Sequence, residues 1–100
     1  MGLFNAYKSL AKANEILKRI ENCIDLLEDN INSGNFSQAR TYCNEAASRV
    51  REFLEVCGGS KTAEISVYTF KGQKFRVMQL AMLFNEALLN ANFIIKQYGY

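Results

Sequence analysis

The amino-acid sequence predicts an all-α fold, an antiparallel three-helix bundle with helices at about 3–33, 35–57 and 73–98. Apolar residues recur at steps of three and four along most of the chain, as they do in amphipathic helices. Glycines interrupt this pattern at 34 and at 58–59, where helices are expected to end. At 100 residues, 49% of them hydrophobic, the chain has the size of one average domain. We therefore expect residues 1–100 to form a single helical domain.

The first predicted helix carries one continuous apolar stripe. Ile16 and Cys23 flank the stripe on one side and Tyr7 on the other, which widens it to the face that a helix of a globular protein buries. Such a helix would be roughly 45 Å long, at about 1.5 Å per residue. The stripe consists of Leu3, Ala6, Leu10, Ala13, Leu17, Ile20, Ile24, Leu27 and Ile31.

A turn and a second amphipathic helix follow. Gly34 can adopt the positive φ that ends a helix, and Asn35 or Ser37 can cap the next one. Small residues in the middle of the second helix allow its backbone to approach the first helix closely. The apolar positions are Phe36, Ala39, Cys43, Ala46, Val50, Phe53 and Cys57, and Gly58-Gly59 ends the helix.

The connection over residues 60–72 has two interpretations. Residues 62–70 concentrate β-branched and aromatic residues, and Lys71-Gly72-Gln73 can form a hairpin turn into residues 74–77. Alternatively, Ala63, Val67 and Phe70 fall in register with the helix that follows. The sequence predicts an irregular or hairpin-like connection, and we favour a loop or irregular helix.

The third predicted helix is apolar around most of its circumference. Polar residues such as Gln79 and Asn85 interrupt the run of about 20 apolar residues that a membrane span needs, so no membrane segment is expected. Two neighbouring helices cannot cover so wide an apolar surface, and the surplus predicts a partner: a second copy in a homodimer or another helical protein. The residues expected to contact it are Met78, Leu83, Leu89 and Phe93.

The residue types argue against enzymatic chemistry. The chain has no histidine, which removes the commonest general base and a principal zinc ligand. Cys23, Cys43 and Cys57 form no closely spaced pair, and the acidic residues Asp25 and Glu28 lie off the apolar stripe, where carboxylates are normally solvated. We expect no catalytic residue, no metal and no cofactor. The leading prediction is a non-enzymatic protein–protein interaction module that associates with itself through the third helix.

A local basic cluster supports an alternative function. The net charge of +2 is too small for a nucleic-acid-binding surface that covers the whole domain. However, Lys71, Lys74 and Arg76 gather before the third helix, and three aromatic residues lie between or beside them. Such a cluster predicts an accessory protein that binds nucleic acid or another anion, with solvated loop lysines as the competing interpretation. The aromatic residues available for stacking would be Tyr68, Phe70 and Phe75.

The turn and the start of the second helix carry a family resemblance. The segment Gly34–Ala46, GNFSQARTYCNEA, resembles the turn and second helix of a tetratricopeptide repeat, where glycine, an aromatic residue and two alanines recur at this spacing. The resemblance implies close helix packing and a protein-binding role. The polar N-terminus and the odd number of widely spaced cysteines predict a cytoplasmic location.

Overall fold

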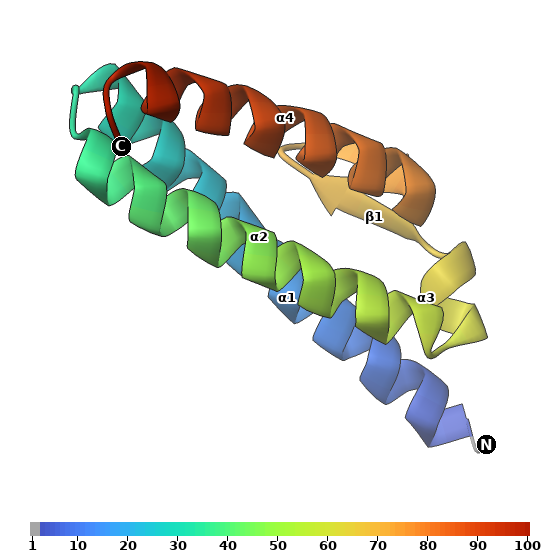
Figure 1. Ribbon diagram of the computed structural model, residues 1–100. Coiled ribbons are helices and arrows are strands. Elements are labelled where there is room, and N and C mark those ends of the chain that lie inside the picture. Colours follow the sequence, from blue (N-terminus) through green and yellow to red (C-terminus); the bar gives the residue numbers. More distant parts are fainter. Residues whose placement is uncertain (1–2) are drawn as a thin grey trace.

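The computed structural model describes the backbone of residues 3–100 and the side chains of residues 7–100. Two long helices, α1 (Leu3–Asn32) and α2 (Phe36–Gly58), lie side by side and run in opposite directions (Figure 1). A third long helix, α4 (Val77–Gln97), lies over this pair. Between α2 and α4 the chain forms a short helix, α3 (Lys61–Ile65), and two strands, β1 (Val67–Phe70) and β2 (Gln73–Arg76). The mostly helical fold is confirmed, but residues 3–100 form four helices and a two-stranded sheet, not three helices alone.

The predicted stripe of α1 lies against α2 and supplies part of the core. Residues from Ala13 to Leu27 on the stripe are buried, Leu10 and Ile31 are half-buried, and the side chains of Leu3 and Ala6 lie outside the described residues. Tyr7 was expected to widen this face, but its side chain is 60% exposed. The α2 prediction is confirmed in detail, since the small positions Ala39, Cys43 and Ala46 are at most 1% exposed. These small side chains allow the two helix backbones to lie close together.

The turn between α1 and α2 forms at the predicted glycine. Gly34 has a φ of 76°, and its amide donates a hydrogen bond of 3.1 Å to the carbonyl of Ile31. The amide of Asn35 donates one of 2.8 Å to the carbonyl of Asn30. These bonds satisfy carbonyls at the end of α1 that have no partner within the helix. Asn35 takes the N-cap position of α2, but its side chain makes no capping hydrogen bond.

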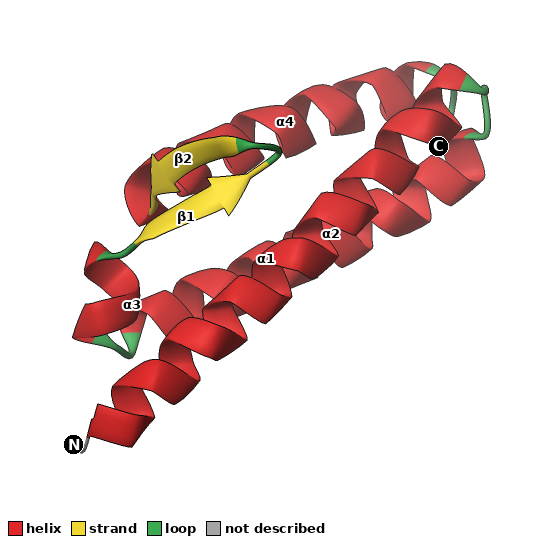
Figure 2. Cartoon of the chain, turned by 180° about the vertical axis from the view of Figure 1, so that it is seen from behind, coloured by secondary structure: helices red, strands yellow, loops and turns green. Residues whose placement is uncertain are grey.

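The connection contains a β-hairpin, so our preference for a loop or irregular helix was wrong. The strands pair antiparallel, with Tyr68 opposite Phe75 and Phe70 opposite Gln73 (Figure 2). The turn residues Lys71 and Gly72 have φ values of 50° and 79°. Two consecutive positive φ angles are typical of the tight turns whose twist matches paired strands. Residues 67–70 are extended because successive side chains of a strand point to opposite faces, so that every second residue of β1 is buried.

The hairpin also shortens the third predicted helix at its start. Residues 73–76 form β2, and α4 begins at Val77. The backbone amide of Arg76 donates a hydrogen bond of 2.8 Å to Oε1 of Gln79, which satisfies the amide before the first turn of α4. Phe70 of β1 meets Phe84 of α4 edge to face, with ring centroids 5.1 Å apart. This aromatic contact fixes the hairpin beneath the first half of α4.

The far end of α4 is tied to the start of α2. Arg40 donates hydrogen bonds of 2.8 Å to Oδ1 of Asn92 and of 3.1 Å to the backbone carbonyl of Tyr100. The rings of Phe36 and Tyr98 stack with centroids 4.0 Å apart. Both ends of α4 are therefore anchored, and α4 runs antiparallel to α2. Among the described residues, no helix has the length and apolarity needed to cross a lipid bilayer.

Candidate interaction surface

The inner face of α4 supplies its share of the core. Val77, Leu80, Phe84, Ala91 and Ile95 are at most 8% exposed. Val77, Leu80 and Phe84 join the main core cluster with α1, α2 and the hairpin, while Ala91 and Ile95 join a second cluster with α1 and α2 near the turn. Leu80 is fully buried in the main core cluster, which also contains Tyr68 and Phe70 of the hairpin. The first half of α4 is therefore covered more widely than two helices alone would allow.

The opposite side of α4 is apolar and uncovered. Met78 and Met82 are each 72% exposed, Leu89 is 60% exposed and Phe93 is 65% exposed. Residues separated by four, seven or eleven positions lie on one line along a helix. These four residues have such spacings, so their side chains lie on one line. We call this set, Met78, Met82, Leu89 and Phe93, the outer stripe. It extends over about 22 Å, at about 1.5 Å per residue.

The outer stripe contains three of the four residues that the sequence predicted for partner contact. Met78, Leu89 and Phe93 lie on it, but Leu83 does not. Leu83 is half-buried against the core cluster and lines a hollow with Phe70 and Phe75. Met82 was missed, although its spacing of four from Met78 and seven from Leu89 places it on the same line.

Hollows lie on both sides of α4. On the α2 side, a hollow of about 290 Å³ lies beside Leu89 and is lined by Val50, Leu54, Ala81 and Asn85, among others. On the α1 side, two adjoining hollows of about 380 and 280 Å³ share Ile24, Glu28 and Ala87 in their walls. α4 therefore projects from the surface as a ridge, with the outer stripe along its crest.

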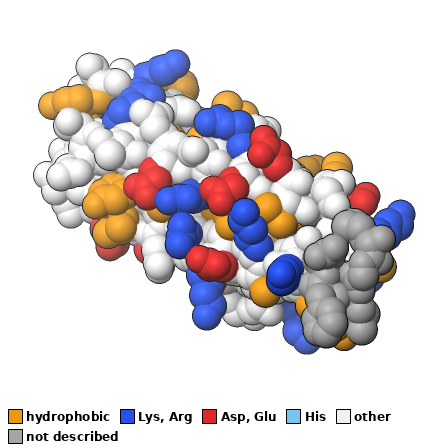
Figure 3. All heavy atoms as spheres, turned by 90° about the horizontal axis from the view of Figure 1, so that it is seen from below, with side chains coloured by type: hydrophobic (Ala, Val, Ile, Leu, Met, Phe, Trp, Pro, Cys, Tyr) orange, Lys and Arg blue, Asp and Glu red, His pale blue; other side chains and the backbone are white. Residues whose placement is uncertain are grey.

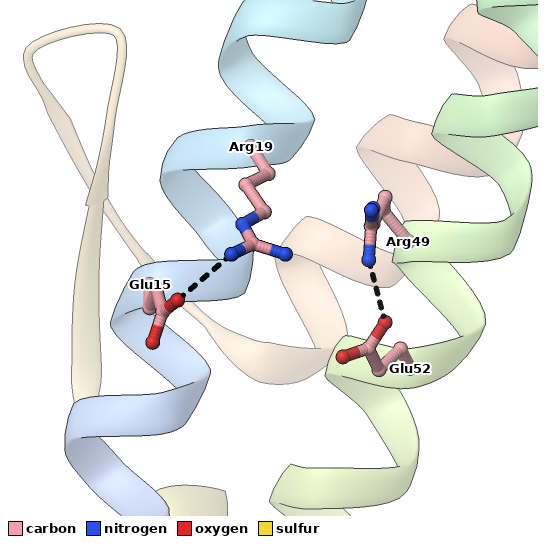
Figure 4. A network of polar contacts seen from close by, with 4 residues as sticks. All are labelled: Glu15, Arg19, Arg49 and Glu52. Carbon is pink, nitrogen blue, oxygen red and sulfur yellow. Dashed lines mark hydrogen bonds and ion pairs between the residues drawn. The ribbon is translucent and has the colours of Figure 1, made fainter.

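The face formed by α1 and α2 away from α4 has a different character. Basic and acidic side chains alternate along the middle of this face (Figure 3). Arg19 pairs with Glu15 on α1 at 3.0 Å, and Arg49 pairs with Glu52 on α2 at 3.2 Å (Figure 4). Pairs of this kind keep a helix surface hydrated and contribute little to stability. This face is typical of a solvated surface, whereas the outer stripe is not.

The three cations of the predicted basic cluster have different partners. Nζ of Lys71 lies 2.5 Å from Oδ1 of Asp25 on α1, and the hydrogen bond to that carboxylate raises the pKa of Lys71. The guanidinium of Arg76 donates a hydrogen bond to the backbone carbonyl of Ile65. Lys74 lies exposed on β2. The three cations thus have different environments. Of these three, Lys74 is the one whose side chain makes no hydrogen bond or ion pair with another described residue.

The aromatic side chains beside the basic cluster mostly belong to the core. Tyr68 is 1% and Phe70 is 6% exposed, and Phe75 is half-buried against the same core. Stacking on a nucleic-acid base requires an accessible ring face. Tyr68 and Phe70 offer none in this conformation.

The three cysteine thiols lie in the core. Cys23, Cys43 and Cys57 are buried and not disulfide-bonded, and burial raises the pKa of each thiol. For Cys23, the nearby carboxylate of Glu45 raises the pKa further. A raised thiol pKa lowers the thiolate fraction on which nucleophilic reactivity depends. Among the described residues, no group of cysteine, aspartate and glutamate side chains could hold a metal ion.

No family model, no curated protein and no solved structure matches the sequence or the fold.

Proposed function

We propose that this chain is a non-enzymatic helical interaction module that associates with a second copy of itself through the outer stripe of α4. One observation carries the proposal: four large apolar side chains, each 60–72% exposed, lie on one line along a helix anchored at both ends. Isolated exposed apolar residues are common on proteins, but contiguous apolar patches of this kind mark interaction sites. The ridge geometry suits a helical partner, because the side-chain ridges of one helix pack into the grooves of another.

Three further features support the proposal. The methionines of the stripe have flexible side chains that adapt to a partner surface. The charged side chains of the α1–α2 face, which include two ion pairs, keep that face hydrated, so it does not compete for the same contact. The tetratricopeptide-like segment Gly34–Ala46 agrees with a binding role by analogy.

Three unpaired thiols are in keeping with a reducing compartment, and we place the protein in the cytoplasm.

Sedimentation velocity over a range of micromolar concentrations tests the proposal. The wild-type chain should show a concentration-dependent rise in sedimentation coefficient. Leu89→Glu should abolish it, because a charge in the middle of the stripe would have to be buried in the interface. Leu26→Glu is the matched control, since Leu26 is 42% exposed on α1, beside Tyr42 and Arg49 of α2 and away from α4.

A wild-type chain that stays monomeric throughout would contradict the proposal. So would equal losses of association in the Leu89→Glu and Leu26→Glu variants, since the contact would then lie elsewhere or the loss would be non-specific. Circular dichroism of each variant should retain the helical signal, because both positions are exposed in the single chain.

A further inference from the structure

We infer that two copies of α4 pair antiparallel about a two-fold axis that passes between Asn85 and Glu86. In this arrangement Met82 packs on the partner's Leu89, and Met78 packs on the partner's Phe93. The inference rests on the proposed self-association and adds to it the direction and register of the two helices.

The spacing of the outer stripe is the same when read in either direction. Met78 and Met82 are four residues apart, and so are Leu89 and Phe93, with seven residues between Met82 and Leu89. The midpoint between Met82 and Leu89, and likewise between Met78 and Phe93, falls between residues 85 and 86. A two-fold interface uses the same patch on both copies and requires that patch to be complementary to itself. When the second helix is reversed about this midpoint, every apolar residue of the stripe meets another one.

The contacts created by this register are sterically and chemically suitable. Leu89 borders the hollow of about 290 Å³ between α2 and α4, whose walls also include Val50 and Leu54. The partner's Met82, opposite Leu89, has a long flexible side chain that can fill this hollow. Met78 would place its sulfur beside the aromatic ring of the partner's Phe93, a contact that thioethers favour.

The polar group beside the axis can be satisfied by its own copy. Asn85 is exposed on the α2 side of the stripe and lines the same hollow as Leu89. Close to a two-fold axis, its side chain faces the partner's Asn85. An amide carries both donors and acceptors, so two identical amides can hydrogen-bond to each other.

The charges on α4 favour the antiparallel over the parallel direction. Lys96 lies eighteen residues after Met78, which is five helical turns, and so continues the line of the outer stripe. Parallel helices would bring Lys96 against the partner's Lys96, whereas the antiparallel register separates the two by about 30 Å. Antiparallel helices also oppose their dipoles. Glu86 does meet the partner's Glu86, but it lies at the exposed rim, where water and salt screen the repulsion.

The area of the stripe is enough for a small specific interface. Four apolar side chains exposed to this degree present roughly 500 Å², and with the flanking polar residues the two copies would bury on the order of 1,200 Å² in total. This buried area is at the lower end of the range for specific interfaces, so we expect a dissociation constant in the micromolar range.

Cysteine cross-linking tests the direction and register. The variants Met82→Cys and Leu89→Cys are prepared separately, and one of them carries a mass tag. Each variant by itself, and a mixture of the two, is then treated with a short bismaleimide. The inference predicts that the mixed, tagged–untagged product forms at several times the yield of either variant alone. Cys23, Cys43 and Cys57 are at most 6% exposed, so the wild-type chain should give little product and serves as the background control.

The possible outcomes separate this inference from the proposed function. Efficient cross-linking of each variant with itself, and weak product in the mixture, would overturn the antiparallel register while keeping the dimer. A concentration-dependent dimer with no cross-linking at either position would overturn the use of the outer stripe. A strict monomer would remove both proposals.

Charge removal gives an independent readout that needs no cysteine. Glu86→Gln should lower the dissociation constant several-fold and Lys96→Gln should leave it unchanged, because only the Glu86 side chains face each other in the antiparallel pair. Tighter association with Lys96→Gln would indicate parallel helices, in which the two Lys96 side chains lie together, and would overturn the inference.

Discussion

The phenol hydroxyl of Tyr68 donates a hydrogen bond of 2.6 Å to the backbone carbonyl of Ala63, and so ties β1 to α3. The thiol of Cys57 donates a longer bond of 3.8 Å to the same hydroxyl. The ring of Tyr68 lies edge to face with Phe53 of α2, at a centroid distance of 5.3 Å. This one side chain therefore joins three elements that meet at the end of the molecule.

Removal of the Tyr68 hydroxyl should destabilise the fold. Tyr68→Phe keeps the ring but leaves the buried carbonyl of Ala63 without this donor, and we expect a loss of about 1–2 kcal/mol in the free energy of unfolding. Urea denaturation measures it. Tyr7→Phe is the control, because Tyr7 is 60% exposed and its loss should stay within about 0.5 kcal/mol. Equal effects in the two variants would contradict the role assigned to the buried hydroxyl.

Stability should also fall at alkaline pH. Burial, followed by the hydrogen bond with Cys57, raises the pKa of Tyr68 above its ordinary value of 10.0. The unfolded chain then loses this proton at a lower pH than the native chain does. The contribution of this group to the free energy of unfolding is therefore complete below about pH 10. Above that pH it declines, by at most about 1.4 kcal/mol per pH unit for one group. The free energy of unfolding, measured by urea denaturation at increasing pH, should fall less steeply in Tyr68→Phe than in the wild type.

Two glycines should respond in opposite directions to alanine. Gly72 has a φ of 79° in the hairpin turn, where a Cβ is strained even though no atom lies within 4 Å of it. Gly72→Ala should lose about 1–2 kcal/mol. Gly58 lies in the last turn of α2, again with nothing within 4 Å, so Gly58→Ala should be neutral or gain up to about 1 kcal/mol. Thermal unfolding of the pair measures this difference, and similar shifts in both would contradict the hairpin turn.

The contact between Arg40 and the end of α4 should control local order. Arg40→Ala removes the bonds to Asn92 and to the carbonyl of Tyr100, so we expect faster amide exchange over the last turn of α4. The global loss should be about 1 kcal/mol. Arg51→Ala on the exposed side of α2 provides the control and should leave exchange in α4 unchanged.

The native thiols should be slow to react. Because burial raises the pKa of Cys23, Cys43 and Cys57, a thiol reagent at neutral pH should label them at the rate at which the protein opens. Addition of urea should accelerate labelling in parallel with unfolding. Rapid stoichiometric labelling of one native thiol would contradict this expectation and would revive an enzymatic interpretation.

Helix positions were predictable because the local pattern is unambiguous. The stripes of α1 and α2 repeat at steps of three and four, and their observed bounds differ from the predicted ones by about one residue. Gly34 was recognisable because few other residues adopt its positive φ. The hairpin was harder to choose, since Ala63, Val67 and Phe70 also suit a helical register. Which register wins depends on whether α1 and α4 are present to cover Tyr68 and Phe70.

For the candidate surface, the sequence by itself determined that the last helix carries more apolar residues than an α1–α2 pair can cover. Only the tertiary structure decided which of them stay exposed. Leu80 is buried in the main core cluster and Leu83 lies beside the hairpin, whereas Met82 faces outward. The physical reason is that periodicity defines angles around one helix, but burial depends on which neighbours occupy those angles, and the hairpin is placed there by contacts between residues distant in sequence.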